Sequence, residues 1–157
     1  MKLGILSDSH DNLIKIERAV KFFNKNKVYF VLHAGDFVAP FTIPKLNGLS
    51  CEWQGVFGNN DGERVGLAGA SEGKIIAAPL RMELVNRKIV LVHDINTINP
   101  QEEEADLIIF GHTHNPEIIN QGKKVIVNPG ECGGWLTGKS TVALIDLVSL
   151  SAEHFKI

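Results

Sequence analysis

Apolar runs that end at polar residues dominate the first half of the chain. Residues 2–7, 28–32 and 52–57 are largely apolar, β-branched or aromatic, without a strict alternation of polar and apolar positions. This pattern is typical of strands whose two faces are both covered by other elements. The three runs therefore predict strands within a layered α/β structure.

Helical spacing appears between the first two runs. Apolar side chains recur every three or four positions over residues 13–23, with lysines between them, and Asp11 or Asn12 precedes this segment as a helix cap. A short helix is expected with Pro40 near its start. Residues 66–73 are interpreted as a loop only.

The second half consists mainly of short strand-like segments with little helix between them. Strands are expected at residues 80–85, 88–93, 107–110, 117–120, 124–128, 141–148 and 153–157. Asn86-Arg87 and Gly122 mark hairpin turns. An early strand–helix half followed by a strand-rich half predicts two packed sheets with flanking helices.

Size and composition limit the class of protein. The 157 residues have the size of one ordinary domain, so we expect a single domain over residues 1–157. A formal net charge of -2 argues against stable binding to nucleic acid. No apolar run approaches the roughly 20 residues of a membrane span. Cys51 and Cys132 form no disulfide framework, so we expect a cytoplasmic protein.

Polar residues with metal-binding side chains stand at the ends of the apolar runs. They are Asp8, His10, Asp36, Asn59, His93, His112 and His114. Strand ends converge at one edge of a sheet, and residues two apart in an extended segment point to the same side. The pairs Asp8 with His10 and His112 with His114 are therefore each expected to present two ligands to one point.

The chemistry of this set favours a transition metal over calcium. Four imidazoles, two carboxylates and one amide suit Mn²⁺, Ni²⁺, Co²⁺, Fe²⁺ or Zn²⁺. Only a carboxylate can bind two cations at once, so Asp8 or Asp36 would bridge a pair of metals. Gly35, Gly58 and Gly111 flank the ligands, as expected where a side chain would resist the backbone angles that leave a strand.

The ordered motifs resemble those of the calcineurin-like metallophosphoesterases. The matching segments are Asp8-Ser9-His10, Gly35-Asp36, Gly58-Asn59-Asn60-Asp61, His93 and Gly111-His112-Thr113-His114. The compact length and the stretch Asn128-Pro129-Gly130-Glu131-Cys132 are most similar to the small YfcE-like phosphodiesterase branch of bacteria and archaea. The resemblance implies a four-layer α/β/β/α sandwich of two mixed sheets with flanking helices.

The resemblance also implies a site with two divalent metal ions, Mn²⁺ being preferred. Asp8, His10, Asp36 and His114 would hold one ion, and Asp36, Asn59, His93 and His112 would hold the other, with Asp36 as the bridge. A metal-activated hydroxide would then hydrolyse a small phosphodiester. Catalytic roles fall on Asp36, Asn59, Asn60 and Asp61, and the ions would attract an anionic substrate despite the acidic chain.

One position departs from the wider superfamily. Asn60 stands where a histidine commonly follows the metal-binding asparagine, and an amide cannot protonate a leaving group. We therefore expect weak activity on esters with poor leaving groups. Asn60 and Arg64 are candidate substrate-binding residues, although Arg64 is equally interpreted as an ordinary exposed arginine.

Several residues have structural alternatives. His93 lacks the glycine that commonly follows this histidine, so a core histidine is the alternative to a ligand. His33 is interpreted as a buried, hydrogen-bonded residue or a partner of a ligand, and His154 as a surface residue. Cys132 is interpreted as structural rather than nucleophilic. Asn12 and Asp61 are expected either to orient ligands or simply to stabilise a cap and a turn.

Three other functions are consistent with the same residues. A phosphomonoesterase would use the same metals on a different ester. A protein-binding scaffold of this fold would have lost activity, which the seven preserved ligands oppose. A metal store or sensor would bind ions without turnover. Members of this branch are often homodimers or homotetramers, and the physiological substrate is not specified by the sequence.

Overall fold

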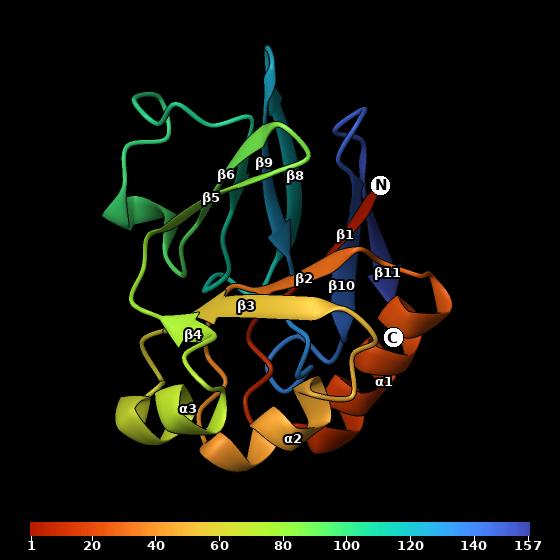
Figure 1. Ribbon diagram of the computed structural model, residues 1–157, viewed down its shortest axis with the longest axis vertical. Helices are drawn as coiled ribbons and strands as arrows, with labels where there is room; N and C mark the ends of the chain where they lie inside the picture. Colours follow the sequence, from red (N-terminus) through yellow and green to blue (C-terminus); the bar gives the residue numbers. More distant parts are fainter.

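The three apolar runs of the first half form neighbouring strands of the first sheet, and these strands are parallel. The computed structural model describes residues 1–157. The strand order is β11 (Ala152–Lys156), β10 (Thr141–Asp146), β1 (Lys2–Leu6), β2 (Phe30–His33), β3 (Glu52–Val56) and β4 (Ile75–Ile76). β1, β2, β3 and β4 are parallel, whereas β10 and β11 are antiparallel to their neighbours. Figure 1 shows this sheet above a layer of helices.

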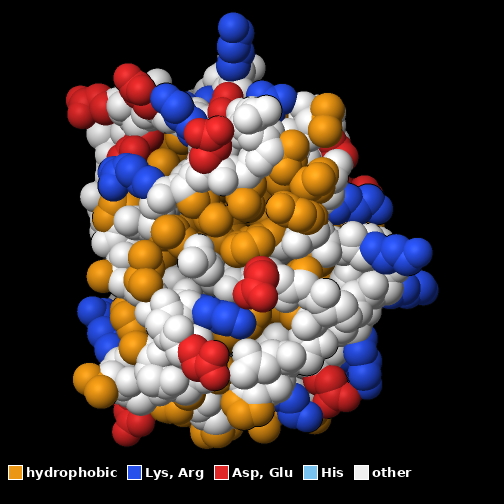
Figure 2. Space-filling model, viewed as in Figure 1, with side chains coloured by type: hydrophobic (Ala, Val, Ile, Leu, Met, Phe, Trp, Pro, Cys, Tyr) orange, Lys and Arg blue, Asp and Glu red, His pale blue; other side chains and the backbone are white.

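The second sheet is also mixed and packs face to face with the first. Its strand order is β5 (Leu80–Leu84), β6 (Arg87–Leu91), β7 (Leu107–Ile109), β9 (Lys124–Pro129) and β8 (Pro116–Gln121). β6, β7 and β9 are parallel, and each outer strand forms a hairpin with its neighbour. Figure 2 shows apolar side chains over the edge strand β5, where Leu80, Met82 and Leu84 are half-buried.

One hairpin turn differs from its expected position. The turn between β5 and β6 consists of Val85 and Asn86, which have φ of 53° and 57°, and Arg87 already belongs to β6. Two positive φ values in succession define a tight turn that matches the twist of the strands. The register of the hairpin overrides the usual reluctance of valine to adopt this conformation. The turn at Gly122 is confirmed, because it lies between β8 and β9.

Helices cover the outer face of the first sheet. α1 (Leu13–Lys25) buries Ile16, Ala19, Val20 and Phe23, which are the positions that its helical spacing predicts. Asn12 caps it by accepting a hydrogen bond from Lys15 N at 3.3 Å. Pro40 begins a 3₁₀ turn, η1 (Pro40–Thr42), that continues into α2 (Ile43–Leu46). The expected cap and the expected short helix are both confirmed.

The expected loop at residues 66–73 is wrong in its first half. α3 (Arg64–Ala70) is helical and buries Leu67. Gly66 and Gly69 lower its intrinsic helix propensity, which explains why the pattern predicted a loop. Burial of Leu67 in the core beneath the helix outweighs that cost, because most helical stability in proteins comes from tertiary packing.

Three apolar clusters correspond to the layers. A cluster of 16 buried residues lies between the helices and the first sheet, and a cluster of 15 lies between the two sheets. A smaller cluster of 5 lies on the outer face of the second sheet, where η2 (Ile95–Thr97) and its flanking residues cover it. The α/β class with two mixed sheets and flanking helices is confirmed, with a thinner outer layer over the second sheet. None of the helices combines the length and hydrophobicity that crossing a membrane requires.

The loops that follow the central strands of both sheets meet at one end of the sandwich. Gly111 N, after β7, donates to the carbonyl of His93, after β6, at 2.9 Å. His112 N then donates to Asp8 Oδ2 at 3.1 Å and so joins the second sheet to the loop that follows β1. These hydrogen bonds hold the polar residues at the strand ends of both sheets close together.

Candidate metal centre

Two buried aspartates stand after neighbouring parallel strands. Asp8 follows β1 and Asp36 follows β2, and their exposed fractions are 0% and 1%. Backbone hydrogen bonds join the loops, from Asp8 N to the carbonyl of Gly35 at 3.0 Å and from His10 N to that of Asp36 at 3.1 Å. Burial raises the pKa of Asp8, and the Asp36 carboxylate adds to this effect. A cation between the two carboxylates would relieve the cost of burying them.

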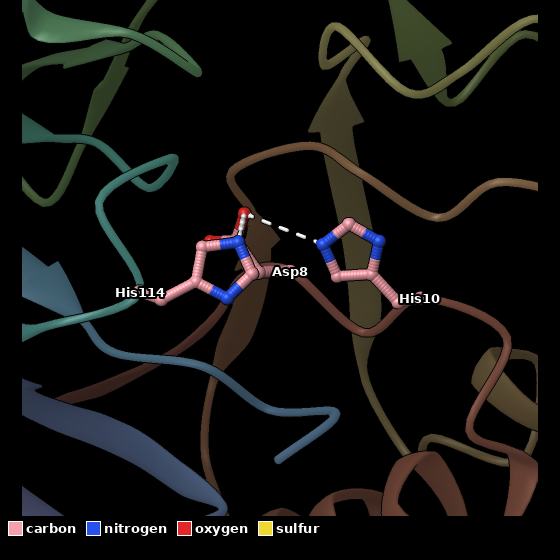
Figure 3. A group of neighbouring side chains, drawn as sticks. All are labelled: Asp8, His10 and His114. Atoms are coloured by element: carbon pink, nitrogen blue, oxygen red, sulfur yellow. Dashed lines mark ion pairs between the residues drawn. The ribbon is translucent and has the colours of Figure 1, made fainter. Parts of the chain in front are cut away.

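Asp8, His10 and His114 form one group of possible metal ligands. Figure 3 shows the two imidazole rings on either side of Asp8. Asp8 Oδ1 lies 3.9 Å from His10 Nε2 and 3.5 Å from His114 Nε2. These separations are too long for hydrogen bonds, but ligands that share a tetrahedral cation lie about 3.4 Å apart. Asp8 Oδ1 and His10 Nε2 are buried without a hydrogen-bond partner, so their environment fits a cation.

A second group of possible ligands consists of Asp8, Asp36 and His93, and a single oxygen of Asp36 faces imidazoles of both groups. Asp36 Oδ2 lies 3.5 Å from His10 Nε2 and also 3.5 Å from His93 Nε2. Asp8, Asp36 and His93 are close enough for one ion to contact all three. Asp8 belongs to both groups by proximity, but Asp36 Oδ2 lies 3.5 Å from an imidazole on each side, whereas Asp8 makes no comparably close contact with His93. Asp36 is therefore better placed than Asp8 to bridge two ions.

Asn59 completes the second group with two histidines. Asn59 Oδ1 lies 2.8 Å from His93 Nε2 and 2.9 Å from His112 Nδ1. His93 Nδ1 lies 2.8 Å from the carbonyl of Ala34, which can only accept, so this nitrogen carries the proton. The lone pair of a neutral His93 then points at the amide oxygen of Asn59. Lone pairs that converge in this way suit a cation, and the carbonyl contact fixes the ring as in known metal-binding histidines.

The ligand pairs are not extended, contrary to expectation. Asp8, His10, His112 and His114 have φ of 51°, 41°, 66° and 61°. Left-handed turns, rather than strand alternation, therefore aim these side chains. His112 reaches Asn59 while His114 reaches Asp8. The two-residue spacing thus brings Asp8 and His10 to one group but sends His112 and His114 to different groups.

Glycines allow the loops to approach the carboxylates. A Cβ at Gly58 would overlap Asp36 Oδ1, and a Cβ at Gly111 would lie 2.8 Å from Asp8 Oδ2. Gly35 has φ of 98°, as its position at the end of a strand predicts. Gly58 and Gly111 have ordinary backbone angles, and glycine is needed there because no space remains for a side chain. A side chain at Gly58 would displace the Asp36 carboxylate, and one at Gly111 would displace the Ser7 hydroxyl and crowd the Asp8 carboxylate.

Asn60 and Asp61 hold the Asp36 loop. Asn60 donates from its backbone N to Asp36 Oδ1 at 2.8 Å and from Nδ2 to Asp36 Oδ2 at 2.7 Å. The buried Asp61 carboxylate accepts hydrogen bonds from the backbone N of Asp36, Val38 and Gly58 at 3.1, 2.7 and 2.7 Å. Both residues thus fix the position of the carboxylate that faces both groups.

Glu131 is a residue of the site that sequence reasoning missed. Its carboxylate is fully buried, and Oε1 lies 3.5 Å from His114 Nδ1. Burial acts to raise the pKa of Glu131, but hydrogen bonds from Leu136 and Thr137 outweigh it and hold the pKa below the ordinary value. An ionised carboxylate behind an imidazole orients the ring and makes it a better ligand. A glutamate inside the Asn128–Cys132 stretch was the available signal.

The structure confirms the expected position of His33 but not that of His154. His33 is buried and lies 2.9 Å from Ser9 Oγ through Nε2, which confirms a buried, hydrogen-bonded residue. The surface position expected for His154 is wrong, because it is half-buried and its Nε2 contacts the carbonyl of Asn128 at 2.7 Å. Burial raises the pKa of the Cys132 thiol to about 12, in keeping with a structural role. His154 was expected at the surface because it lies near the C-terminus, but the pairing of β11 with β10 brings it inward.

A pocket of about 270 Å³ adjoins the second group. Its walls include Phe57, Asn59, Arg64, His93 and His112. The Arg64 guanidinium lies 5.3 Å from the centre of the Phe57 ring. Arg64 donates to the carbonyls of Asp61 and Gly58 at 3.2 and 3.4 Å. Its charge is therefore fixed beside the candidate ligands by backbone oxygens rather than by a carboxylate.

The chain matches a known family along most of its length. The model of the calcineurin-like phosphoesterase superfamily domain matches residues 1–149. A phosphodiesterase of Methanocaldococcus jannaschii is 35% identical over 154 residues, which cover 93% of each chain. With the convergence of Asp8, Asp36 and the histidines, these matches show that the chain belongs to the calcineurin-like phosphoesterase superfamily.

Solved structures agree with this assignment. An archaeal phosphodiesterase superposes with a TM-score of 0.92 at 33% identity, and the match covers 100% of both chains. The phosphoesterase Yfce of Escherichia coli has a TM-score of 0.73 at 23% identity, again over 100% of both chains, and shows the fold alone. The resemblance to small phosphoesterases that the motifs indicated is therefore confirmed.

Proposed function

We propose that this protein hydrolyses phosphodiesters at a centre of two divalent cations. Asp8, His10, Asp36 and His114 would hold one ion, and Asp36, Asn59, His93 and His112 would hold the other. The observation that carries this proposal is the position of Asp36 Oδ2, which lies 3.5 Å from an imidazole of each set. When bound, the ions would supply an activated water and neutralise the charge of the phosphoryl group.

The donor set supports a transition metal. It contains imidazole, carboxylate and amide atoms but no thiolate, because Cys51 and Cys132 lie outside both groups. Such ligands suit Mn²⁺, with Ni²⁺, Co²⁺, Fe²⁺ and Zn²⁺ as alternatives. The unpartnered atoms Asp8 Oδ1 and His10 Nε2 fit a resident cation.

Residues around the centre have separate roles in this proposal. Asn60 and Asp61 position the Asp36 carboxylate, and Asn60 is also within reach of a substrate that enters beside it. Arg64 binds the substrate with the guanidinium N–H groups that Asp61 and Gly58 leave free. The pocket beside Asn59 and His112 receives the leaving group, because the fixed positive charge of Arg64 stabilises the negative charge that develops on its oxygen.

We favour a diester over a monoester as the substrate, because an archaeal relative is named a phosphodiesterase. The alternative is a phosphomonoesterase, which would use the same ligands. We further propose that the chain acts as one domain in the cytoplasm, in keeping with its two free cysteines. We also predict a homodimer or homotetramer, and static light scattering would measure the mass of the assembly.

Hydrolysis assays test the proposal directly. Metal-stripped protein is given Mn²⁺, Ni²⁺, Mg²⁺ or Zn²⁺ with bis-p-nitrophenyl phosphate or p-nitrophenyl phosphate. We expect diester cleavage that Asp36→Ala abolishes, whereas the exposed Glu153→Ala serves as a control with normal activity. Cleavage of the monoester alone would identify a phosphatase. Metal binding without cleavage of either ester would contradict catalysis and favour a scaffold or a metal store.

A further inference from the structure

Two large apolar side chains stand in solvent next to the candidate centre. Trp135 is 66% exposed and Leu136 is 79% exposed, in the loop between β9 and β10. An exposed tryptophan is costly to leave in water and is a common anchor for ligands. In Figure 3 the loop that follows β9, drawn in blue, passes below His114 and His10.

The indole is tied to the backbone of a candidate metal ligand. Trp135 Nε1 donates to the carbonyl of His10 at 2.9 Å. The imidazole of the same His10 faces Asp8 and Asp36. The polar edge of the ring is therefore satisfied within the site, while most of its apolar surface is left uncovered.

The loop that carries Trp135 is rigidly anchored. Gly133 N donates to the carbonyl of Asp8 at 2.9 Å, and Asn12 Nδ2 donates to the carbonyl of Gly133 at 2.7 Å. Leu136 N donates to Glu131 at 2.9 Å, and this glutamate lies behind His114. An aromatic ring that is already fixed loses little entropy when a ligand covers it.

We propose that Trp135 is a specificity-determining residue that stacks on a planar aromatic substituent of the phosphodiester. This inference rests on the proposed function. A diester carries two organic groups, and the pocket beside Arg64 takes the leaving group on the side of Asn59 and His112. The group retained on phosphorus then lies on the other side of the centre, towards His10, whose backbone carbonyl holds the indole. An aryl ring and a nucleobase share the flat π-face that this surface recognises.

Diesters with one common leaving group test the stacking. The substrates are methyl p-nitrophenyl phosphate, bis-p-nitrophenyl phosphate and the p-nitrophenyl ester of thymidine 5′-phosphate. Stacking of a ring on an aromatic side chain accounts for about a tenfold change in affinity. We therefore expect Trp135→Ala to raise KM about tenfold for the two aromatic diesters, with kcat and the methyl ester little changed. A larger effect on the thymidine ester identifies a nucleobase, and a larger effect on the aryl ester identifies an aryl group.

Two variants separate stacking from other roles. Trp135→Phe retains the ring but loses the hydrogen bond to His10, so we expect it to keep most of the preference for aromatic diesters. Val148→Ala removes another exposed apolar side chain, 64% exposed, and should change neither parameter. An equal loss on all three diesters, or no loss on any, would overturn the proposal. If all diesters and all metals are inactive even in the wild type, the proposed function itself fails.

Fluorescence supplies a measurement independent of turnover. Trp53 is buried and Trp135 is exposed, so indole emission that responds to a ligand reports on Trp135. With Zn²⁺ present, we expect diphenyl phosphate, but not dimethyl phosphate, to change the emission of the wild type and to leave that of Trp135→Phe unchanged. A Trp135→Ala variant with an altered mass in light scattering and an unchanged KM would instead assign this surface to contact between copies of the chain.

Discussion

The buried carboxylate of Glu131 lies 3.5 Å from His114 Nδ1, and the opposite nitrogen of that imidazole lies 3.5 Å from Asp8 Oδ1. A carboxylate, a histidine and a second carboxylate therefore form a continuous row from the loop after β9 to the end of β1. The same Glu131 accepts hydrogen bonds from Leu136 N and Thr137 N, each at 2.9 Å. One residue thus supports both a candidate metal ligand and the loop that carries Trp135.

Substitution of Glu131 should weaken metal binding. Glu131→Gln removes the negative charge behind His114, and loss of such a partner typically costs about 10- to 100-fold in metal affinity. Competition with a chelator measures the affinity, and the exposed Glu117→Gln provides a matched control. Lower folding stability with unchanged affinity would show that Glu131 acts only on the loop.

Glycine substitutions distinguish a crowded position from an open one. A Cβ at Gly111 would lie 2.8 Å from Asp8 Oδ2, so Gly111→Ala should lower the free energy of unfolding by about 1–3 kcal/mol and weaken metal binding. Gly69 has open space around its Cβ position and lies inside α3, so Gly69→Ala should raise stability by about 0.5–1 kcal/mol. Chemical denaturation measures both. Equal effects of the two variants would contradict the close approach of Gly111 to the centre.

The amide at Asn60 should limit hydrolysis of alkyl esters. It donates to both oxygens of Asp36 and has no proton to give to a leaving group. We expect the wild-type rate to fall steeply as the pKa of the leaving group rises, and Asn60→His to flatten this dependence. Rates for a series of substituted phenyl and alkyl diesters provide the measurement. A flat dependence in the wild type would remove the proposed deficit of acid catalysis.

The Asp146 carboxylate should contribute stability that depends on pH. Hydrogen bonds from Ser149 N, the N-terminal ammonium and Val148 N lower its pKa to about 2. Because the folded-state pKa lies below the unfolded value, the contribution is complete at neutral pH, declines below about pH 4 and disappears below both values. Asp146→Asn should therefore be less stable than the wild type at pH 7, with the difference narrowing as the pH falls from about 4 towards 2 and disappearing only below the folded-state pKa. A difference that persists unchanged at low pH would contradict this account.

The sequence by itself determined the first helix, the identities of the candidate ligands and every strand except the two-residue strand β4, which the apolar pattern did not predict. Unbroken apolar runs specify covered strands, and the spacing of Ile16, Ala19, Val20 and Phe23 specifies one buried helical face. The polar residues that end those runs could be recognised because strand ends converge. These features are local, so they depend only on neighbours along the chain.

Only the tertiary structure shows why the ligands divide into two sets, a division that the family resemblance implied and that spacing along the chain did not. His112 and His114 are two residues apart, yet left-handed turns direct one to Asn59 and the other to Asp8. Glu131 joins His114 because two strands and their loops bring distant segments together. α3 forms despite two glycines, because burial of Leu67 outweighs weak local propensity. Such contacts join residues that are not neighbours in the sequence, so the local pattern of apolar and polar residues cannot predict them.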